Sequence, residues 1–120
     1  MILVVEDHEL YGQAVGKLLE TAGHEVTLLG SGEAALAFLS QNRPEIIILD
    51  VDLPGISGLE LLRSLRGRKE LCDIPVIVST SSPDPRIESQ AVSAGATFIS
   101  KGSQQLQNLP SVVAQCLRTG

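Results

Sequence analysis

Five short apolar runs, several of them dominated by Val and Ile, recur along the chain, and none alternates apolar with polar positions. They are Met1–Val5, Val26–Leu29, Ile46–Leu49, Val76–Val78 and Phe98–Ile99. Continuous apolar runs of this length are typical of strands that are buried on both faces, as in a parallel sheet. This feature favours folds in which helices cover both sides of one sheet.

Amphipathic stretches separate these runs and carry helix signals. In the first stretch, apolar residues recur at every fourth position and are expected to face the core: Leu10, Ala14, Leu18 and Ala22. Gly23 is expected to end this helix. Ser31 and Ser57 are the expected N-caps of the next two helices. The segment Pro83–Pro85 opens a fourth helix, and Pro110 is expected in the first turn of a fifth.

Strand and helix signals therefore alternate five times within 120 residues. This pattern predicts an α/β, flavodoxin-like, doubly wound fold with a five-stranded parallel sheet in the order 2-1-3-4-5 and five helices. Right-handed crossovers place the helices on both faces of the sheet. No linker, repeat or low-complexity tract interrupts the chain, so residues 1–120 are expected to form a single domain.

Composition excludes several classes of function. The net charge is −5, and the aromatic residues are limited to Tyr11, Phe38 and Phe98. Direct nucleic-acid binding needs basic and stacking surfaces, which this chain lacks. The apolar runs are far shorter than the ~20 residues of a membrane span, and the N-terminus lacks the basic lead of a signal peptide. Because Cys72 and Cys116 also lack metal-ligand spacing, we expect a cytoplasmic domain with reduced thiols.

Polar residues gather directly after the apolar runs, where the carboxyl ends of parallel strands form binding sites. They are Glu6 and Asp7 after the first run, Asp50 and Asp52 after the third, Ser79, Thr80 and Ser81 after the fourth, and Ser100 and Lys101 after the fifth. In the predicted strand order the first and third strands are neighbours, so Glu6, Asp7 and Asp50 are expected to meet. Thr80 and Lys101 approach from the same edge of the sheet.

Three carboxylates at one place repel one another unless a cation lies between them. Mg²⁺ fits best, because it binds a few carboxylates, keeps several waters and bridges to phosphate oxygens. A lysine and a hydroxyl that face such an ion suit a phosphoryl group. The structural alternative is that each acid merely caps the helix that follows it. That alternative explains any single residue, but it explains the whole set at four strand ends less well.

The segment Ile47–Gly58 carries the strongest resemblance to a known family. An aspartate ends a buried strand, a proline follows four positions later, and a glycine follows that proline. The chain resembles, over essentially its whole length, the receiver domain of two-component response regulators. The resemblance implies that Asp50 is the phosphoacceptor. It also implies that the acidic pair Glu6–Asp7 coordinates Mg²⁺ together with Asp50, and that the backbone carbonyl of Asp52 completes the protein ligands.

Two further segments extend this resemblance. Pro75–Thr80 is similar to the fourth strand of the family, which ends in a switch hydroxyl. Counting from the proline assigns Thr80 to this role, while a slip in register would assign Ser79 or Ser81.

Gly95–Lys101 is similar to the fifth strand, and it closes with the lysine of the family pattern. The resemblance implies that Lys101 contacts the phosphoryl group and that Phe98 is the switch aromatic. The pattern usually continues with proline, where this chain has Gly102. A cis peptide bond is therefore not expected there.

The resemblance implies a signalling switch and not an enzyme with a separate substrate. A sensor histidine kinase or a histidine phosphotransfer protein supplies the phosphoryl group to Asp50, the transfer is self-catalysed, and the acyl phosphate hydrolyses slowly. The output partner is an attached output domain or a downstream protein. A homodimer through the face formed by the fourth helix, the fifth strand and the fifth helix is also implied.

Three alternatives remain at this point. Asp50-Val51-Asp52 also resembles the nucleophile motif of haloacid-dehalogenase-type phosphatases, but in that family the motif follows the first strand. A flavodoxin-like electron carrier shares the predicted fold, but the chain offers few aromatics to enclose a flavin. A degenerate receiver would bind partners without being phosphorylated.

Overall fold

The computed structural model describes residues 1–119, with the exception of the side chains of residues 103–105 and 119. Its strands are β1 (Ile2–Val5), β2 (Val26–Leu29), β3 (Ile46–Asp50), β4 (Val76–Thr80) and β5 (Thr97–Ser100). All neighbouring pairs are parallel, and the strands form one sheet in the order β2-β1-β3-β4-β5. The predicted fold class and strand order are therefore confirmed.

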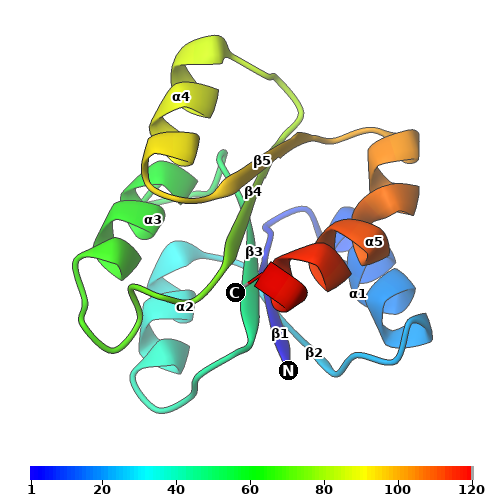
Figure 1. Cartoon of the computed structure of the whole chain (residues 1–120), viewed down its shortest axis with the longest axis horizontal. Coiled ribbons are helices and arrows are strands. Elements are labelled where there is room, and N and C mark those ends of the chain that lie inside the picture. The colour runs from blue at the N-terminus through cyan, green and yellow to red at the C-terminus, as the bar shows by residue number, and fades with distance from the viewer. Residues whose placement is uncertain (120) are drawn as a thin grey trace.

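The helices cover both faces of the sheet. They are α1 (Glu9–Thr21), α2 (Gly32–Leu39), α3 (Gly58–Arg66), α4 (Pro85–Ser93) and α5 (Ser103–Thr119). Figure 1 shows α1 and α5 on one side of the sheet, and α2, α3 and α4 on the other. Right-handed crossovers produce this arrangement, because the chain runs from β1 outward to β2 and then crosses back past β1 to β3, β4 and β5.

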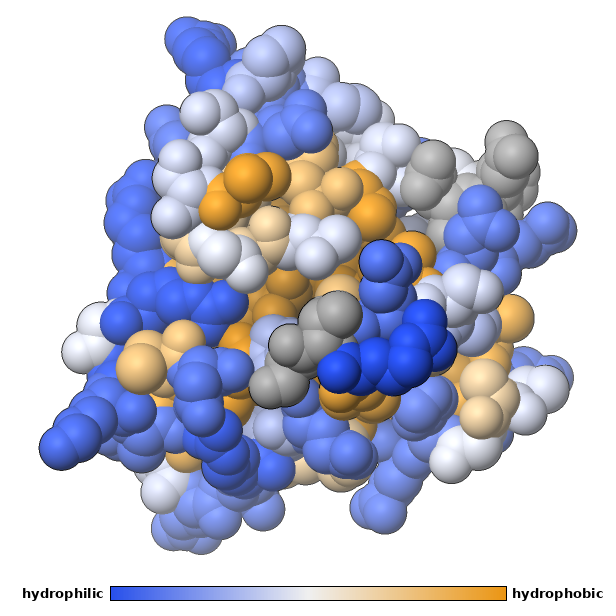
Figure 2. All heavy atoms as spheres, in the orientation of Figure 1, coloured by the Kyte–Doolittle hydropathy of each residue, from blue (hydrophilic) through white to orange (hydrophobic). Residues whose placement is uncertain are grey.

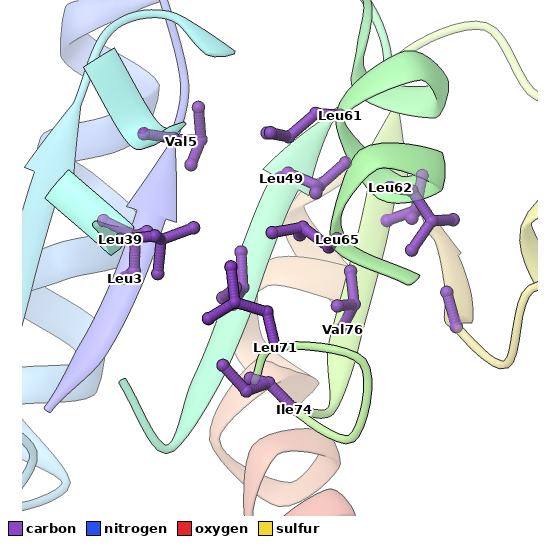
Figure 3. Close-up of a cluster of buried hydrophobic side chains, with 14 of the residues drawn as sticks. Leu3, Val5, Leu39, Leu49, Leu61, Leu62, Leu65, Leu71, Ile74 and Val76 are labelled. Carbon is purple, nitrogen blue, oxygen red and sulfur yellow. The ribbon is translucent and has the colours of Figure 1, made fainter. Parts of the chain in front are cut away.

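Each face of the sheet carries its own core. Along β1, Leu3 and Val5 point into the core under α2 and α3, while Ile2 and Val4 point into the core under α1 and α5. Figure 3 shows the first of these cores, where leucines of α3 lie against β3 and β4. In the central strands β1, β3 and β4 both faces are buried, which explains why their polar residues, Asp50, Ser79 and Thr80, are confined to the carboxyl ends. The two edge strands, β2 and β5, are only partly buried.

The predicted helix starts at Ser31 and Ser57 are confirmed. The Ser31 hydroxyl accepts a hydrogen bond from the Ala34 N–H at 3.1 Å. Ser57 and Glu60 form a reciprocal capping box at the start of α3, with both bonds at 3.2 Å. At α4, Pro85 lies in the first turn as expected, and Asp84 is the N-cap. These caps fix the loops that carry the polar residues above the sheet.

The predicted inward face of α1 is wrong. Leu10 is 83% exposed, and Ala14 and Ala22 are exposed as well. The buried residues of the helix are instead Gly12, Val15, Gly16 and Leu19. Glycines take this face because the helix lies close to the sheet: a Cβ atom at Gly12 would lie 2.9 Å from a methyl carbon of Leu28.

The predicted start of the last helix is also wrong, because α5 begins at Ser103 and Pro110 lies inside it. The helix begins before the proline, with the Leu106 N–H donating to the Gly102 carbonyl at 2.8 Å. An internal proline removes one helical hydrogen bond. Leu109 and Val113, on either side of it, are buried against the sheet, and this packing stabilises the helix across Pro110.

Among residues 1–119, no helix combines the length and apolar character needed to cross a bilayer.

Candidate functional site

The sheet register brings the polar strand ends together. Val5 is the register partner of Leu49, and Glu6 and Asp50 follow them, so these two carboxylates lie side by side. Lys101 directly follows β5, whose last residue pairs with the last residue of β4. The predicted meeting of acidic and basic residues at this edge therefore follows from parallel pairing alone.

Lys101 forms the centre of the cluster. Its Nζ lies 2.6 Å from Glu6 Oε1 and 3.1 Å from Asp50 Oδ2. The side chains of Glu6, Asp50 and Lys101 are only 3%, 4% and 10% exposed. Charges removed from water in this way are stable only when they are paired and hydrogen-bonded. The ammonium group therefore bridges two buried carboxylates that would otherwise repel each other.

Backbone N–H groups satisfy the other carboxylate oxygens. The His8 N–H donates to Glu6 Oε2 at 3.1 Å, and the Asp52 N–H donates to Asp50 Oδ1 at 3.2 Å. Each buried carboxylate thus has one oxygen on Lys101 and the other on the backbone. The loops after β1 and β3 hold the two acids in fixed orientations.

Burial changes the acidity of two groups in the cluster. Burial raises the pKa of Glu6, and the Asp50 charge acts in the same direction, against the hydrogen bonds from Lys101 and the His8 N–H. Burial alone would lower the pKa of Lys101, but its hydrogen bonds to Glu6 and Asp50 outweigh this effect and raise it. The lysine is therefore a cation throughout the physiological pH range.

The acidic residues form a set of oxygen donors. Glu6, Asp7 and Asp50 each offer a carboxylate oxygen, and these oxygens all lie within 4.8 Å of one another. Asp7 is exposed, whereas the other two acids are buried. Carboxylate oxygens that converge beside open solvent match the preference of Mg²⁺, which keeps several of its waters. The donor set therefore fits a hard divalent cation.

The hydroxyl residues at the end of β4 occupy different environments. Thr80 is buried, its hydroxyl accepts a hydrogen bond from the Ser82 N–H at 3.1 Å, and its carbonyl accepts one from the Lys101 N–H at 2.7 Å. Ser79 is also buried, with its hydroxyl 3.5 Å from the Leu49 carbonyl. Ser81 is exposed. The backbone links Thr80, of the three, directly to Lys101.

Two predicted site residues add no side chain to the carboxylate cluster. Phe98 is partly buried and packs against the core under α3 and α4. Asp52 is exposed, and it contacts Asp50 through its backbone N–H. The structure therefore brings together Glu6, Asp7, Asp50 and Lys101, with Thr80 linked through the backbone.

The sequence interpretation missed Tyr11 and Gly58. The ring centroid of Tyr11 lies 4.5 Å from Lys101 Nζ, and burial raises the pKa of the tyrosine. Tyr11 lies in the first turn of α1, close in sequence to the acidic pair Glu6–Asp7, and this proximity was the available signal. Gly58 lies against the backbone of Asp50, a contact that only the fold reveals.

Comparison with known proteins assigns the family. The chain matches the family model of the response regulator receiver domain over residues 2–113. It belongs to this receiver domain family. The polar-differentiation response regulator DivK of Brucella ovis is 38% identical to this receiver domain over 80 residues, which make up 67% of this chain and 65% of DivK. The match therefore spans less than two thirds of that curated relative.

Solved receiver structures share the whole fold. The signal receiver domain of a signal transduction histidine kinase from Syntrophus aciditrophicus superposes with a TM-score of 0.89 at 36% identity, covering 98% of this chain and 89% of that chain. The Mn²⁺-bound form of the response regulator Rcp1 has a TM-score of 0.85 at 30% identity, covering 92% and 91%. The chain is thus a response regulator receiver domain by sequence and by fold, and the phosphatase and flavodoxin alternatives lose their support.

Proposed function

We propose that this receiver domain accepts a phosphoryl group on Asp50 from the phosphohistidine of a sensor histidine kinase or a histidine phosphotransfer protein. The conformational change that results from phosphorylation controls an output domain or a downstream protein in the cytoplasm. The observation that supports this most is the environment of Asp50: a buried carboxylate at the end of β3, paired with Lys101 and beside two further acids. A purely structural aspartate has no need of this arrangement.

The transfer uses one carboxylate oxygen of Asp50 as the nucleophile. This oxygen forms a bond to phosphorus while the bond between phosphorus and the histidine nitrogen breaks. The bonding electrons stay with the imidazole, which leaves in its neutral form after taking a proton. Lys101 pairs with the oxygens of the new acyl phosphate. Attack by water later returns the Asp50 carboxylate and releases inorganic phosphate, so the domain is restored without a separate substrate.

Glu6, Asp7 and Asp50 are the proposed side-chain ligands of Mg²⁺, together with the backbone carbonyl of Asp52. The convergence of three carboxylate oxygens supports this assignment, as does the presence of Mn²⁺ in the Rcp1 structure. When bound, the ion neutralises charge on the phosphoryl oxygens. Lys101 then contributes a second positive charge from the side of β5.

Three residues are proposed to transmit the conformational change that follows phosphorylation: Thr80, Lys101 and Phe98. Phosphorylation adds about −1.5 to −2 charge beside Lys101, and the Thr80 hydroxyl would leave the Ser82 N–H and turn toward the new acceptor oxygens. Phe98 lies on the neighbouring strand and its ring is only partly buried. Space left by Thr80 would let the ring turn inward.

The surface through which partners would recognise this conformational change is the face formed by α4, β5 and α5. Figure 2 shows apolar side chains gathered over β5 between α4 and α5, and Val92 of α4 is 56% exposed. An apolar area of this kind suits a protein partner. An output partner or a second copy of the domain would bind here.

Phosphorylation by a small donor tests the proposal. Acetyl phosphate with Mg²⁺ is expected to add one phosphoryl group to the wild type and to Asp52→Asn, and none to Asp50→Asn, as measured by intact mass. Peptide mapping locates the label. A label on Asp52 would favour the phosphatase-like chemistry instead. A folded wild type that takes up no label would identify a degenerate receiver.

A further inference from the structure

The Lys101 ammonium group has more donors than the carboxylates use. An ammonium carries three N–H groups. Glu6 and Asp50 take two of them, at 2.6 and 3.1 Å. The side chain is largely shielded from solvent, so water alone does not surround the remaining side of the cation. The face of the Tyr11 ring lies on the ammonium, with 4.5 Å between its centroid and Nζ.

The backbone around Lys101 restrains its side chain little. The Lys101 N–H donates to the Thr80 carbonyl at 2.7 Å, which fixes where the side chain begins. The next residue, Gly102, is exposed, and a Cβ atom placed there would meet nothing within 4 Å. A lysine side chain has four rotatable carbons beyond the backbone. The position of its charged end therefore depends on the groups that touch that end.

The Tyr11 ring is itself held in place. It is partly buried and packs against the core on the side of α1 and α5. Among the described residues, the Tyr11 hydroxyl has no hydrogen-bond partner, and the contact with Lys101 is made by the ring face. Aromatic faces attract cations, and they do so more strongly where water is excluded. The Tyr11 ring therefore holds a fixed position and presents the negative electrostatic potential of its face to the ammonium group.

We propose that Tyr11 is a positioning residue of the receiver site, whose ring holds the Lys101 ammonium beside Asp50 before the phosphoryl group arrives. This inference rests on the proposed function, because it assigns a partner to the lysine that contacts the phosphoryl group. The ring removes conformations in which the ammonium points to solvent. A larger fraction of molecules then has the amine in place when transfer begins.

Two substitutions separate the ring from the hydroxyl. Tyr11→Leu keeps an apolar side chain but removes the aromatic face, and we expect it to slow phosphorylation by acetyl phosphate about threefold to thirtyfold. Tyr11→Phe keeps the face and is expected to react at nearly the wild-type rate. Leu10→Ala is the matched control on the same helical turn, because Leu10 is exposed and lies outside the cluster.

Proton NMR of Lys101 gives a readout that needs neither metal nor phosphoryl donor. A methylene group over an aromatic face is shifted upfield, so the ε-protons of Lys101 are expected upfield of those of the exposed Lys17 in the wild type and in Tyr11→Phe. Tyr11→Leu is expected to abolish this difference. The wild-type measurement remains decisive even if Tyr11→Leu fails to fold.

The outcomes separate this inference from the proposed function. If the wild type is phosphorylated on Asp50 and folded Tyr11→Leu reacts equally fast, the positioning role of Tyr11 is wrong while the phosphorylation site stands. An unshifted Lys101 in the wild type would overturn it as well. Equal loss of activity in Tyr11→Phe and Tyr11→Leu would overturn the role of the ring face. Failure of the wild type to accept phosphate would overturn the proposed function instead.

Discussion

Gly58 lies so close to Asp50 that a side chain at position 58 would overlap the backbone carbonyl of the aspartate. A Cβ atom there would lie 2.8 Å from the carbonyl carbon of Asp50, nearer than real Cβ atoms come to such groups. The Gly58 N–H donates to the Val51 carbonyl at 2.9 Å, so the start of α3 is fastened to the end of β3. The glycine allows the helix to support the predicted phosphoacceptor directly.

Gly58→Ala is expected to lower the free energy of unfolding by about 1–3 kcal/mol, because the backbone of β3 or α3 must shift to admit the methyl group. Urea denaturation measures this change. Gly30→Ala is the control, since a Cβ atom at Gly30 meets nothing within 4 Å and its backbone has no positive φ. Equal stability of the two variants would contradict the close contact.

Arg66 is expected to hold the far end of α3 in place. Its Nε donates to the Ala94 carbonyl at 2.7 Å, and its Nη1 donates to the carbonyls of Ile74 at 2.8 Å and Cys72 at 3.1 Å. Arg66→Met leaves these carbonyls without a charged donor. We expect a loss of about 2–3 kcal/mol in the free energy of unfolding, measured by thermal or urea denaturation.

Arg43→Met provides a contrast for the Arg66 prediction. Arg43 contacts the Glu70 carbonyl and lies 2.8 Å from Asp73, but its side chain is 53% exposed. Solvent screens such a pair, so the loss is expected to stay below about 1 kcal/mol. A larger effect at Arg43 than at Arg66 would reverse this ranking of the two arginines.

Lys101→Met is expected to strengthen Mg²⁺ binding while it slows phosphorylation. The ammonium lies among the same carboxylates that are the proposed ligands, and its charge opposes a second cation. Removing this charge is expected to lower the dissociation constant roughly tenfold, about 1.4 kcal/mol. Isothermal titration calorimetry measures the change, with Lys17→Met as the control. Weaker Mg²⁺ binding by Lys101→Met would place the metal elsewhere.

Asp7→Asn is expected to weaken Mg²⁺ binding and to abolish phosphorylation without unfolding the domain. Asp7 is exposed, so its neutralisation leaves the buried charges paired. Glu9→Gln removes a nearby exposed charge that is not a proposed ligand, and it is expected to bind Mg²⁺ as the wild type does. Unchanged affinity in Asp7→Asn would remove this residue from the metal site.

Beryllofluoride with Mg²⁺ is expected to shift the backbone NMR signals of Thr80, Phe98 and α4, as well as those near Asp50. The reason is the proposed inward movement of Thr80, which frees space for the Phe98 ring. A matched sample of Thr80→Ala is expected to keep the shifts near Asp50 and to lose most of those in α4. Shifts confined to the loops around Asp50 in the wild type would contradict the switch assignment.

Patterns of apolar residues predicted the sheet well, because burial on both faces leaves a continuous run that few other structures produce. Asp50, Glu6 and Lys101 were found because parallel strands end at one edge, so their meeting needed only the strand order. Two helix predictions were wrong for tertiary reasons. In α1, Leu10 faces outward while Gly12 and Gly16 share the buried face with Val15 and Leu19, since the glycines allow the helix to approach β2. In α5 packing on both sides of Pro110 overrides its preference for a first turn.

The contacts of Tyr11 and Gly58 could not be predicted in the same way. Each depends on how far a helix lies from the sheet, and that distance is set by the packing of other residues. Periodicity assigns a side chain to a face of a helix, but it does not say which atom of a neighbouring strand that side chain will touch. The register of β4 and β5 likewise had to be seen before Thr80 could be linked to Lys101.

The hydrogen bond from the Lys101 N–H to the Thr80 carbonyl has a kinetic consequence. At 2.7 Å this bond joins two backbone segments that lie 21 positions apart in the sequence, at the ends of adjacent strands. A movement of either segment must stretch the bond or carry the other segment with it. Relaxation-dispersion measurements on the two segments should therefore report one shared exchange rate, and the domain would change state in one step at this edge of the sheet.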